Sequence, residues 1–462
     1  MSKEKTVLKN LTASIKVGPF EVKNRMALAP MNETMANDIG QVTEQFISYY
    51  AARAAGGVGM TITGAISATR KCAMYAWGRN SNLFNVGHLQ GQSLVTDHIH
   101  YFGSLAIAQM LIGWGRQGHA YDPHLEPYAP TGGLPYEIAL DRMSPGLPGS
   151  MRASEGARNF AHGHIPREMT IDEILEEQKE YARSCQLAVN AGYDMIEVHG
   201  PHGYLTHEFL SPFTNKRTDM YGGEWRNRKR FINDMVEKVR YACPGVAVGV
   251  RISAEEHMEG GLSVEEMVDV AKDLEARGAD YISLSDGGGY EECGFLVGPK
   301  EWAEHIPETA AKFKAALKIP VICASQHDPV KADTDIAAGK FDISALGRQL
   351  FIDPEYPNKV TSGQLDEIRF CKRCDVCLKR CLAGITPACP FNPELGREYA
   401  LEKYKIGPRR KNDPLIPKGM SNAPMPSIER PWWKKEVDYL EKGWRPFKGI
   451  PEKYWNIVGG EK

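Results

Sequence analysis

Eight short apolar runs, most of them followed by an amphipathic stretch with helical spacing, organise the chain from about residue 25 to residue 350. Short apolar runs of this kind are typical of parallel strands that are buried on both faces. Eight strand–helix units in unbroken succession favour a closed (β/α)8 barrel, the TIM barrel, over an open doubly wound sheet. The predicted strands cover residues 26–28, 59–63, 105–108, 194–198, 246–250, 281–284, 320–323 and 343–346.

Other segments fit the same architecture. Helical spacing is clearest over residues 170–190, 225–241 and 263–277. Two short runs, residues 15–17 and 20–22, flank Gly18-Pro19 and predict a hairpin that closes the N-terminal end of the barrel. Residues 117–168, rich in Gly, Pro and His, follow the third strand. We expect this insertion to lie over the C-terminal end, where barrels carry their chemistry.

Charge and hydropathy exclude several classes of partner. The 56 basic and 58 acidic residues leave a net charge of −2, so bulk electrostatics favour neither nucleic acid nor an anionic membrane. The N-terminal stretch lacks the apolar region of a secretory signal. No window approaches the roughly 20 apolar residues that span a bilayer. We therefore expect a soluble, cytoplasmic protein that binds neither nucleic acid nor membranes.

Half of the ten cysteines lie between residues 371 and 389. Four of them form the series Cys371-x2-Cys374-x2-Cys377-x11-Cys389. Three thiolates on a tight loop and one distant thiolate can occupy the four iron corners of a [4Fe–4S] cluster. A structural zinc site, the alternative, would normally show two separated Cys-x2-Cys pairs. Cys381 is left over, because a set that includes it breaks the close series.

The loop after the fourth predicted strand reads His199-Gly200-Pro201-His202-Gly203-Tyr204. Two imidazole N–H donors at a barrel mouth can hold negative charge on a substrate oxygen, as an oxyanion hole does. A phenol, with a reference pKa near 10, stays protonated at neutral pH and can deliver a proton. Metal binding and plain packing are the alternatives for this loop.

Two further features are candidate flavin and phosphate contacts; a salt-bridged arginine and an ordinary loop glycine are the alternatives. Arg251 ends the fifth predicted strand, where a guanidinium can stabilise an anionic reduced flavin. Gly347 and Arg348 follow the eighth strand, where barrels bind phosphate. No Gly-x-Gly-x-x-Gly follows a predicted strand, so we expect no Rossmann module for NAD(P) or FAD.

With these motifs the chain resembles the Old Yellow Enzyme family of FMN-dependent oxidoreductases. Its cysteine segment is similar to the iron–sulfur branch that contains bacterial 2,4-dienoyl-CoA reductase and trimethylamine dehydrogenase. Those relatives continue into a C-terminal FAD and NAD(P)H module, to which the resemblance does not extend. The matching stretches are residues 24–25, 29–31, 50–59, 199–205, 209–212 and 215–223, Arg251, Gly347, Arg348 and the four cysteines.

The resemblance implies roles for individual residues. His199 and His202 would bind the activating oxygen of the substrate, and Tyr204 would be the proton donor. Cys371, Cys374, Cys377 and Cys389 would hold the [4Fe–4S] cluster. Contacts to FMN would come from Pro30, Met31, Gly64, Gln109, Arg251, Ala324, Ser325, Gly347 and Arg348.

The resemblance also implies an organisation and an activity. Residues 1–355 would form the FMN-binding barrel and 356–400 the cluster segment. Beyond the resemblance, residues 401–462 hold four of the eight tryptophans, so we expect an extension that packs on the barrel or on a partner subunit; a docking surface for an electron-transfer partner is the alternative. The implied activity is an ene-reductase that reduces the C=C bond of an enone or enoate, of enoyl-CoA, steroid, flavonoid or phenylpropanoid type. Electrons would come from NAD(P)H directly, or from a separate flavoprotein or ferredoxin through the cluster. We expect a homo-oligomer. The alternative is an amine dehydrogenase, disfavoured because trimethylamine dehydrogenase has Tyr where this chain has His199.

Overall fold

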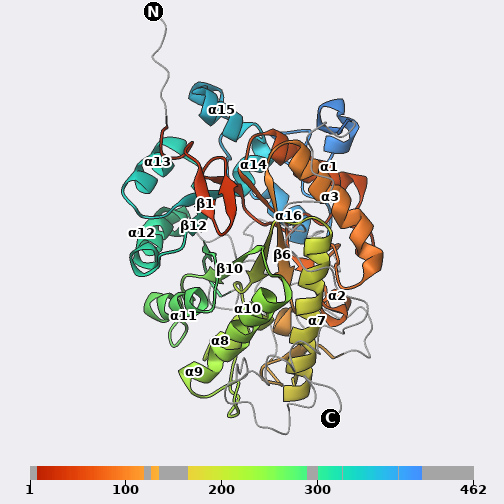
Figure 1. Cartoon of the computed structure of the whole chain (residues 1–462), viewed down its shortest axis with the longest axis vertical. Coiled ribbons are helices and arrows are strands. Elements are labelled where there is room, and N and C mark those ends of the chain that lie inside the picture. The colour runs from red at the N-terminus through yellow and green to blue at the C-terminus, as the bar shows by residue number, and fades with distance from the viewer. Residues whose placement is uncertain are drawn as a thin grey trace, which may run out of the picture.

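The computed structural model describes residues 8–76, 78–118, 126–134, 165–288, 300–324, 326–382 and 384–407. Its centre is a closed ring of eight parallel strands, with helices around the outside (Figure 1). The ring closes because β4 pairs with β3 on one side and with β6 on the other. The predicted barrel is thus confirmed. Its strands are β3 (Met26–Leu28), β4 (Met60–Ile62), β6 (Leu105–Leu111), β9 (Met195–His199), β10 (Ala247–Ser253), β11 (Tyr281–Ser285), β12 (Val321–Ala324) and β13 (Ile343–Leu346).

Helices follow the strands, and the sequence contains capping residues at the starts of two of these helices. Thr170 and Glu173 form a capping box at the start of α7, as Ser263 and Glu266 do at the start of α11. The helix predicted over residues 225–241 is two helices, α9 and α10, which meet at Lys229. The outer helices are α1 (Glu44–Ala55), α2 (Arg70–Met74), α3 (Leu89–Tyr101), α7 (Ile171–Asn190), α8 (Leu205–Leu210), α9 (Trp225–Arg228), α10 (Arg230–Ala242), α11 (Val264–Ala276), α12 (Lys300–Ala316) and α13 (Pro329–Ala337).

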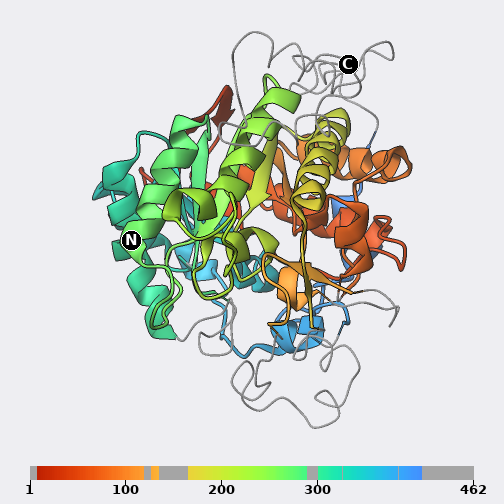
Figure 2. The ribbon, with the colours of Figure 1, turned by 90° about the horizontal axis from the view of Figure 1, so that it is seen from below.

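The predicted hairpin closes one end of the barrel. Strands β1 (Ile15–Val17) and β2 (Phe20–Val22) pair antiparallel around Gly18, whose φ of +54° suits a residue without a side chain. Val17, Phe20 and Val22 are buried against the first residues of several barrel strands, among them Met60, Met195, Ala247, Tyr281 and Ile343. This is the N-terminal end. Figure 2 shows the hairpin (red) and the cysteine segment (blue) on opposite sides of the barrel.

Of the insertion 117–168, the structure describes the two ends and residues 126–134. Strand β7 (Tyr128–Ala129) pairs in parallel with β8 (Arg167–Glu168). Buried Arg217 donates from Nη1 to the carbonyls of Pro130 (2.9 Å) and Met169 (2.7 Å). At its start, Gln117 donates from Nε2 to the carbonyl of His202 over 2.7 Å. The described part of the insertion therefore begins at the histidine loop.

The segment after the barrel packs against α1. Arg53 of α1 is fully buried, forms an ion pair with Glu398, and lies 4.0 Å over the ring of Tyr49. Tyr404 packs on Ala51 and Ala52 of the same helix. Of the expected extension 401–462, residues 401–407 are described. The segment's elements are α14 (Arg348–Ile352), α15 (Tyr356–Ser362), η3 (Leu365–Glu367), α16 (Val376–Leu382), η4 (Glu398–Ala400) and η5 (Glu402–Tyr404). Within the described ranges, no helix has both the length and the apolar composition that a membrane span requires.

Candidate active site

Strand register brings two of the predicted site residues together. His199 is the last residue of β9 and lies opposite Arg251 of β10. The side chains of both residues are buried at the C-terminal end of the barrel. Their adjacency follows from parallel pairing of two strands that stand about fifty residues apart in the sequence.

The three predicted catalytic residues form one aromatic cluster. The ring of His199 lies 5.5 Å from that of His202 and 5.3 Å from that of Tyr204, centroid to centroid. Tyr204 precedes α8 and packs edge-on against Trp114, at 5.0 Å. His202 has a φ of +71°, a left-handed conformation that costs free energy for a residue other than glycine. The loop therefore turns sharply at His202, and that turn directs both imidazoles and the phenol to one place.

Both histidines are neutral at physiological pH. Burial, reinforced by the nearby Arg251 charge, lowers the pKa of His199 to about 3. The same two causes hold the pKa of His202 well below its ordinary value. A neutral imidazole carries one N–H donor and one acceptor nitrogen, and Nδ1 of His199 is buried with no hydrogen-bond partner among the described residues. The pair can therefore offer uncharged N–H groups to an anionic oxygen.

Ser285, the last residue of β11, joins His202 to Arg251. Its Oγ accepts from Nη2 of Arg251 over 3.2 Å and lies 2.6 Å from Nε2 of His202. Because the guanidinium always donates, the serine hydrogen is free to be given to Nε2 of His202. The serine oxygen also has a second lone pair, so either the hydroxyl or Nε2 of His202 can be the donor in this contact. Arg251 also donates from Nη1 to the carbonyl of Pro30 over 3.3 Å.

Below the aromatic cluster of His199, His202 and Tyr204, the buried carboxylate of Glu197 binds Gln109. Nε2 of Gln109 on β6 donates to Oε1 of Glu197 over 2.7 Å, and the Tyr281 hydroxyl donates to Oε2 over 3.1 Å. Glu197 is fully buried, and burial raises its pKa although Arg251 opposes the shift. A Cβ at Gly249 would lie 1.9 Å from the Tyr281 ring, so glycine is required there. Sequence reasoning missed Glu197, although a carboxylate within an apolar strand is a detectable signal.

A second buried carboxylate lies in the loop after β3, beside predicted FMN contacts. The Tyr50 hydroxyl donates to Oε2 of Glu33 over 3.0 Å and accepts from the Gly64 N–H over 2.7 Å. A Cβ at Gly64 would lie 2.2 Å from the Met31 carbonyl oxygen and 2.4 Å from Oε2 of Glu33. Only glycine therefore fits at position 64. Tyr50 opens the matching stretch 50–59, but nothing in the sequence pairs it with Glu33.

Glu33 should make stability depend on pH. Burial raises the pKa of Glu33 from 4.5 to about 7. A raised carboxyl pKa means that the folded protein holds the proton where the unfolded chain releases it, so unfolding free energy falls as pH rises from 4.5 to 7 and then stays level. In Glu33→Gln this fall should be smaller by about 3 kcal/mol. Urea unfolding of both proteins across that pH range measures the difference.

The control for this experiment is Glu259→Gln, which removes an exposed carboxylate. It should leave the pH profile of the native protein unchanged. If Glu33→Gln and Glu259→Gln show the same profile, the assignment of the pH dependence to Glu33 is wrong.

The four cysteines of the predicted cluster line a single pocket. Residues from α14 and from the loop that follows Cys389 complete its wall, including Arg348, Phe351 and Phe391. Among the described residues, no three His, Cys, Asp or Glu side chains come close enough to bind one metal ion. In a [4Fe–4S] cluster each thiolate binds a different iron, so such ligands stand further apart than those of a single ion. Four thiols around one pocket are a donor set that fits a cluster, and the cluster itself stays a prediction.

Arg348 faces the cysteine pocket. Its Nη1 contacts Oδ1 of Asp375, between two of the predicted cluster ligands. Gly347 lies beside Met31, since a Cβ at Gly347 would be 3.0 Å from the Met31 sulfur. Ala324 ends β12, and Ser325 lies outside the described residues. Cys381, the unused cysteine, is buried and donates from Sγ to the Asn32 carbonyl over 3.4 Å. The cysteine segment thus contacts the loop that follows β3.

Comparison with known proteins identifies the class. Residues 10–367 match the model of the NADH:flavin oxidoreductase / NADH oxidase family. An NADH oxidase of Thermoanaerobacter brockii is 31% identical over 90% of this chain and 61% of its own length. A cinnamate reductase of Clostridium sporogenes is 30% identical over 84% of this chain and 58% of its own length. The structure of a 2-naphthoyl-CoA reductase with 2-naphthoyl-CoA superposes with a TM-score of 0.74 at 27% identity, over 85% of this chain and 58% of that chain.

The chain belongs to the NADH:flavin oxidoreductase / NADH oxidase family. The resemblance to the Old Yellow Enzyme family is thereby confirmed. The chain spans about three fifths of the length of the relatives named above.

Proposed function

We propose that the protein is an FMN- and [4Fe–4S]-dependent ene-reductase, which reduces the C=C bond of an α,β-unsaturated carbonyl compound. An FMN held at the C-terminal end of the barrel would supply the hydride for the β-carbon. His199 and His202 bind the carbonyl oxygen through their N–H groups and stabilise the negative charge that develops on it. Tyr204 delivers a proton to the α-carbon.

One observation carries this proposal: two neutral, buried imidazoles and a phenol meet at the barrel mouth beside a buried cation. The hydrogen bonds from these N–H donors strengthen as negative charge develops on the carbonyl oxygen. The Tyr204 ring lies within 5.3 Å of the His199 ring, so one substrate can meet the donors and the acid together.

The residues of the barrel mouth fit an FMN. Nε of Arg251 and Nδ1 of His199 are buried polar atoms without a partner among the described residues, and such atoms are costly unless a ligand satisfies them. Pro30 and Met31 follow β3, Gly64 follows β4, and Gln109 and Arg251 lie in the C-terminal halves of β6 and β10, where barrels carry their sites. We assign to them, with Ala324, Ser325, Gly347 and Arg348, the contacts to FMN. The relatives named above support the substrate class, since cinnamate is an unsaturated acid.

Electrons reach the flavin by one of two routes. NAD(P)H can reduce it directly, or an electron-carrying protein can deliver electrons through a cluster at Cys371, Cys374, Cys377 and Cys389. Anaerobic addition of NADH to the purified holoprotein, followed at the flavin absorption band, separates the two routes.

The ene-reductase proposal is tested by mixing dithionite-reduced holoprotein anaerobically with cinnamate, 2-cyclohexenone or trimethylamine. We expect the two unsaturated carbonyl compounds to reoxidise the flavin and to yield saturated products, and trimethylamine to leave the flavin reduced. Oxidised protein that is reduced by trimethylamine, and inert towards a wide panel of enones and enoates, would show that the proposal is wrong and favour the amine dehydrogenase.

A further inference from the structure

The cysteine pocket opens towards the surface of the protein. Cys374 is exposed, and so is Lys372, which lines the same pocket. Pro390 and Phe391 form another part of the wall and are exposed as well. A cluster held by these cysteines would therefore lie close to solvent, within reach of another protein.

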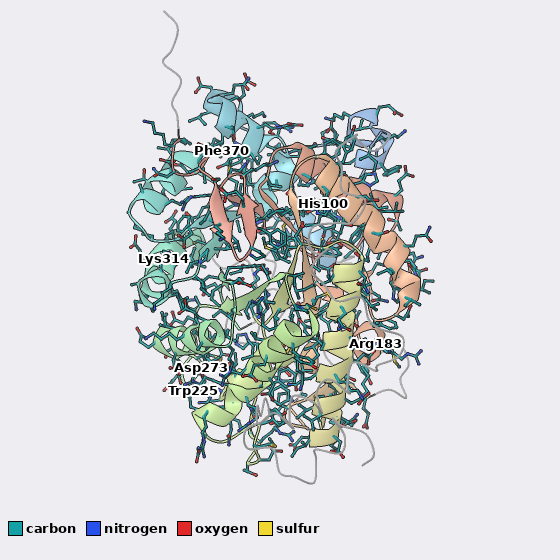
Figure 3. The ribbon with its side chains drawn as sticks, in the orientation of Figure 1. His100, Arg183, Trp225, Asp273, Lys314 and Phe370 are labelled. Carbon is teal, nitrogen blue, oxygen red and sulfur yellow. The ribbon has the colours of Figure 1, made fainter. Side chains whose placement is uncertain are left out.

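Three large apolar side chains of the cysteine segment and its flanks are exposed. Phe370 (labelled in Figure 3) is 43% exposed, Ile385 42% and Phe391 48%. Phe370 immediately precedes the first cysteine of the series, and Phe391 follows the last by two residues. Aromatic side chains with this exposure next to a functional pocket are typical of surfaces that bind another protein.

The sequence of the cysteine segment is rich in basic residues, and one of them, Lys372, lines the pocket. Residues 368–385 include the basic residues Arg369, Lys372, Arg373, Lys379 and Arg380. The single acid in that stretch, Asp375, is already paired with Arg348. The whole chain carries a net charge of −2, so this excess is local. We call Phe370, Lys372, Lys379, Ile385 and Phe391 the basic–aromatic surface.

We propose that the basic–aromatic surface docks a small, acidic one-electron carrier protein. This inference rests on the proposed function, because it presumes a cluster in the pocket. A positive surface attracts an acidic partner and speeds its association. The C-terminal residues 408–462 are a poor occupant, since they contain twelve basic residues and seven acidic ones and would be repelled.

A carrier that docks there would supply the electrons that reduction of the C=C bond consumes. Each reduced carrier protein donates one electron to the cluster and is itself oxidised. Two successive carriers supply the two electrons that saturate one C=C bond, and two protons from solvent complete it. The exposed Cys374 marks the side of the pocket that a carrier approaches.

The test measures binding of a purified acidic ferredoxin with a single [4Fe–4S] cluster to the holoprotein by surface plasmon resonance, at low and high NaCl. The double variant Phe370→Ser/Lys379→Glu should weaken binding about tenfold or more, mostly at low salt. The matched control Val330→Ser/Lys272→Glu changes an exposed valine of α13 and an exposed lysine of α11, and should leave binding within about twofold of the native value.

Iron and sulfide content, and enone reduction by dithionite-reduced protein, should be the same in both double variants as in the native protein. Equal binding by the two double variants, or no binding by the native holoprotein, overturns the docking surface. In that case an intact enone reduction shows that the proposed function survives. If binding depends on salt as expected but no enone is turned over, the docking surface stands and the proposed ene-reductase function is wrong.

Discussion

Tyr204→Phe should slow the reduction of an accepted enone by about 10²–10⁴-fold, because it removes a positioned acid. The ring itself is retained, so its packing against Trp114 and His199 stays intact and the fold should be unaffected. The rate is measured anaerobically in a single turnover, as reoxidation of the prereduced flavin by 2-cyclohexenone. Substrate affinity should change little, since the oxygen would be bound by the two histidines.

Two further variants complete this test. His199→Ala should lower the same rate by about 10²–10³-fold and also weaken binding, because it removes an oxyanion donor. Tyr75→Phe is the control: this phenol donates to the carbonyl of Glu126 over 2.7 Å and has no assigned role in the chemistry. If Tyr204→Phe turns over every accepted enone at the native rate, with chemistry rate-limiting, the proton donor lies elsewhere.

Cys389→Ser should remove nearly all iron and acid-labile sulfide from the purified protein. A [4Fe–4S] cluster needs four thiolates. Cys389 would be the fourth ligand, separated by eleven residues from the close series of three. Serine lacks the soft donor that iron–sulfur clusters require. Iron, sulfide and zinc are measured on anaerobically purified protein. The loss should leave the barrel folded, because Cys389 lies outside it.

Cys381→Ser is the matched control for the cluster. Cys381 does not line the pocket, and its contact to the Asn32 carbonyl can be kept by a serine hydroxyl. It should retain iron at the native level. Iron retained in Cys389→Ser, iron lost in Cys381→Ser, or zinc in place of iron in the native protein would each contradict the assigned ligand set.

The barrel and the capped helices were predictable because their signals are local. A parallel strand that is buried on both faces must be apolar along its length, and this made all eight strands visible. The capping boxes at Thr170 and Ser263 place helix starts within one turn. The histidine loop was found because His199, His202 and Tyr204 lie within six residues of one another.

The partners of those residues were not predictable, since they come from distant strands. Ser285 reaches His202 and Arg251 only because β9, β10 and β11 are neighbours in register. Glu33 meets Tyr50 and Gly64 across a loop, and no spacing in the sequence encodes that contact. The insertion differs again, because much of residues 117–168 lies outside the described part.

The sequence by itself determined the barrel, the family, the histidine loop and the cysteine series, because hydrophobic periodicity and short residue spacings can be read directly from the amino-acid sequence. Only the tertiary structure decided that both imidazoles are neutral, that Arg348 faces the cysteine pocket, and that Arg53 ties the cysteine segment to α1. Burial and charge proximity set these properties, and both are sums over residues that are far apart in the chain.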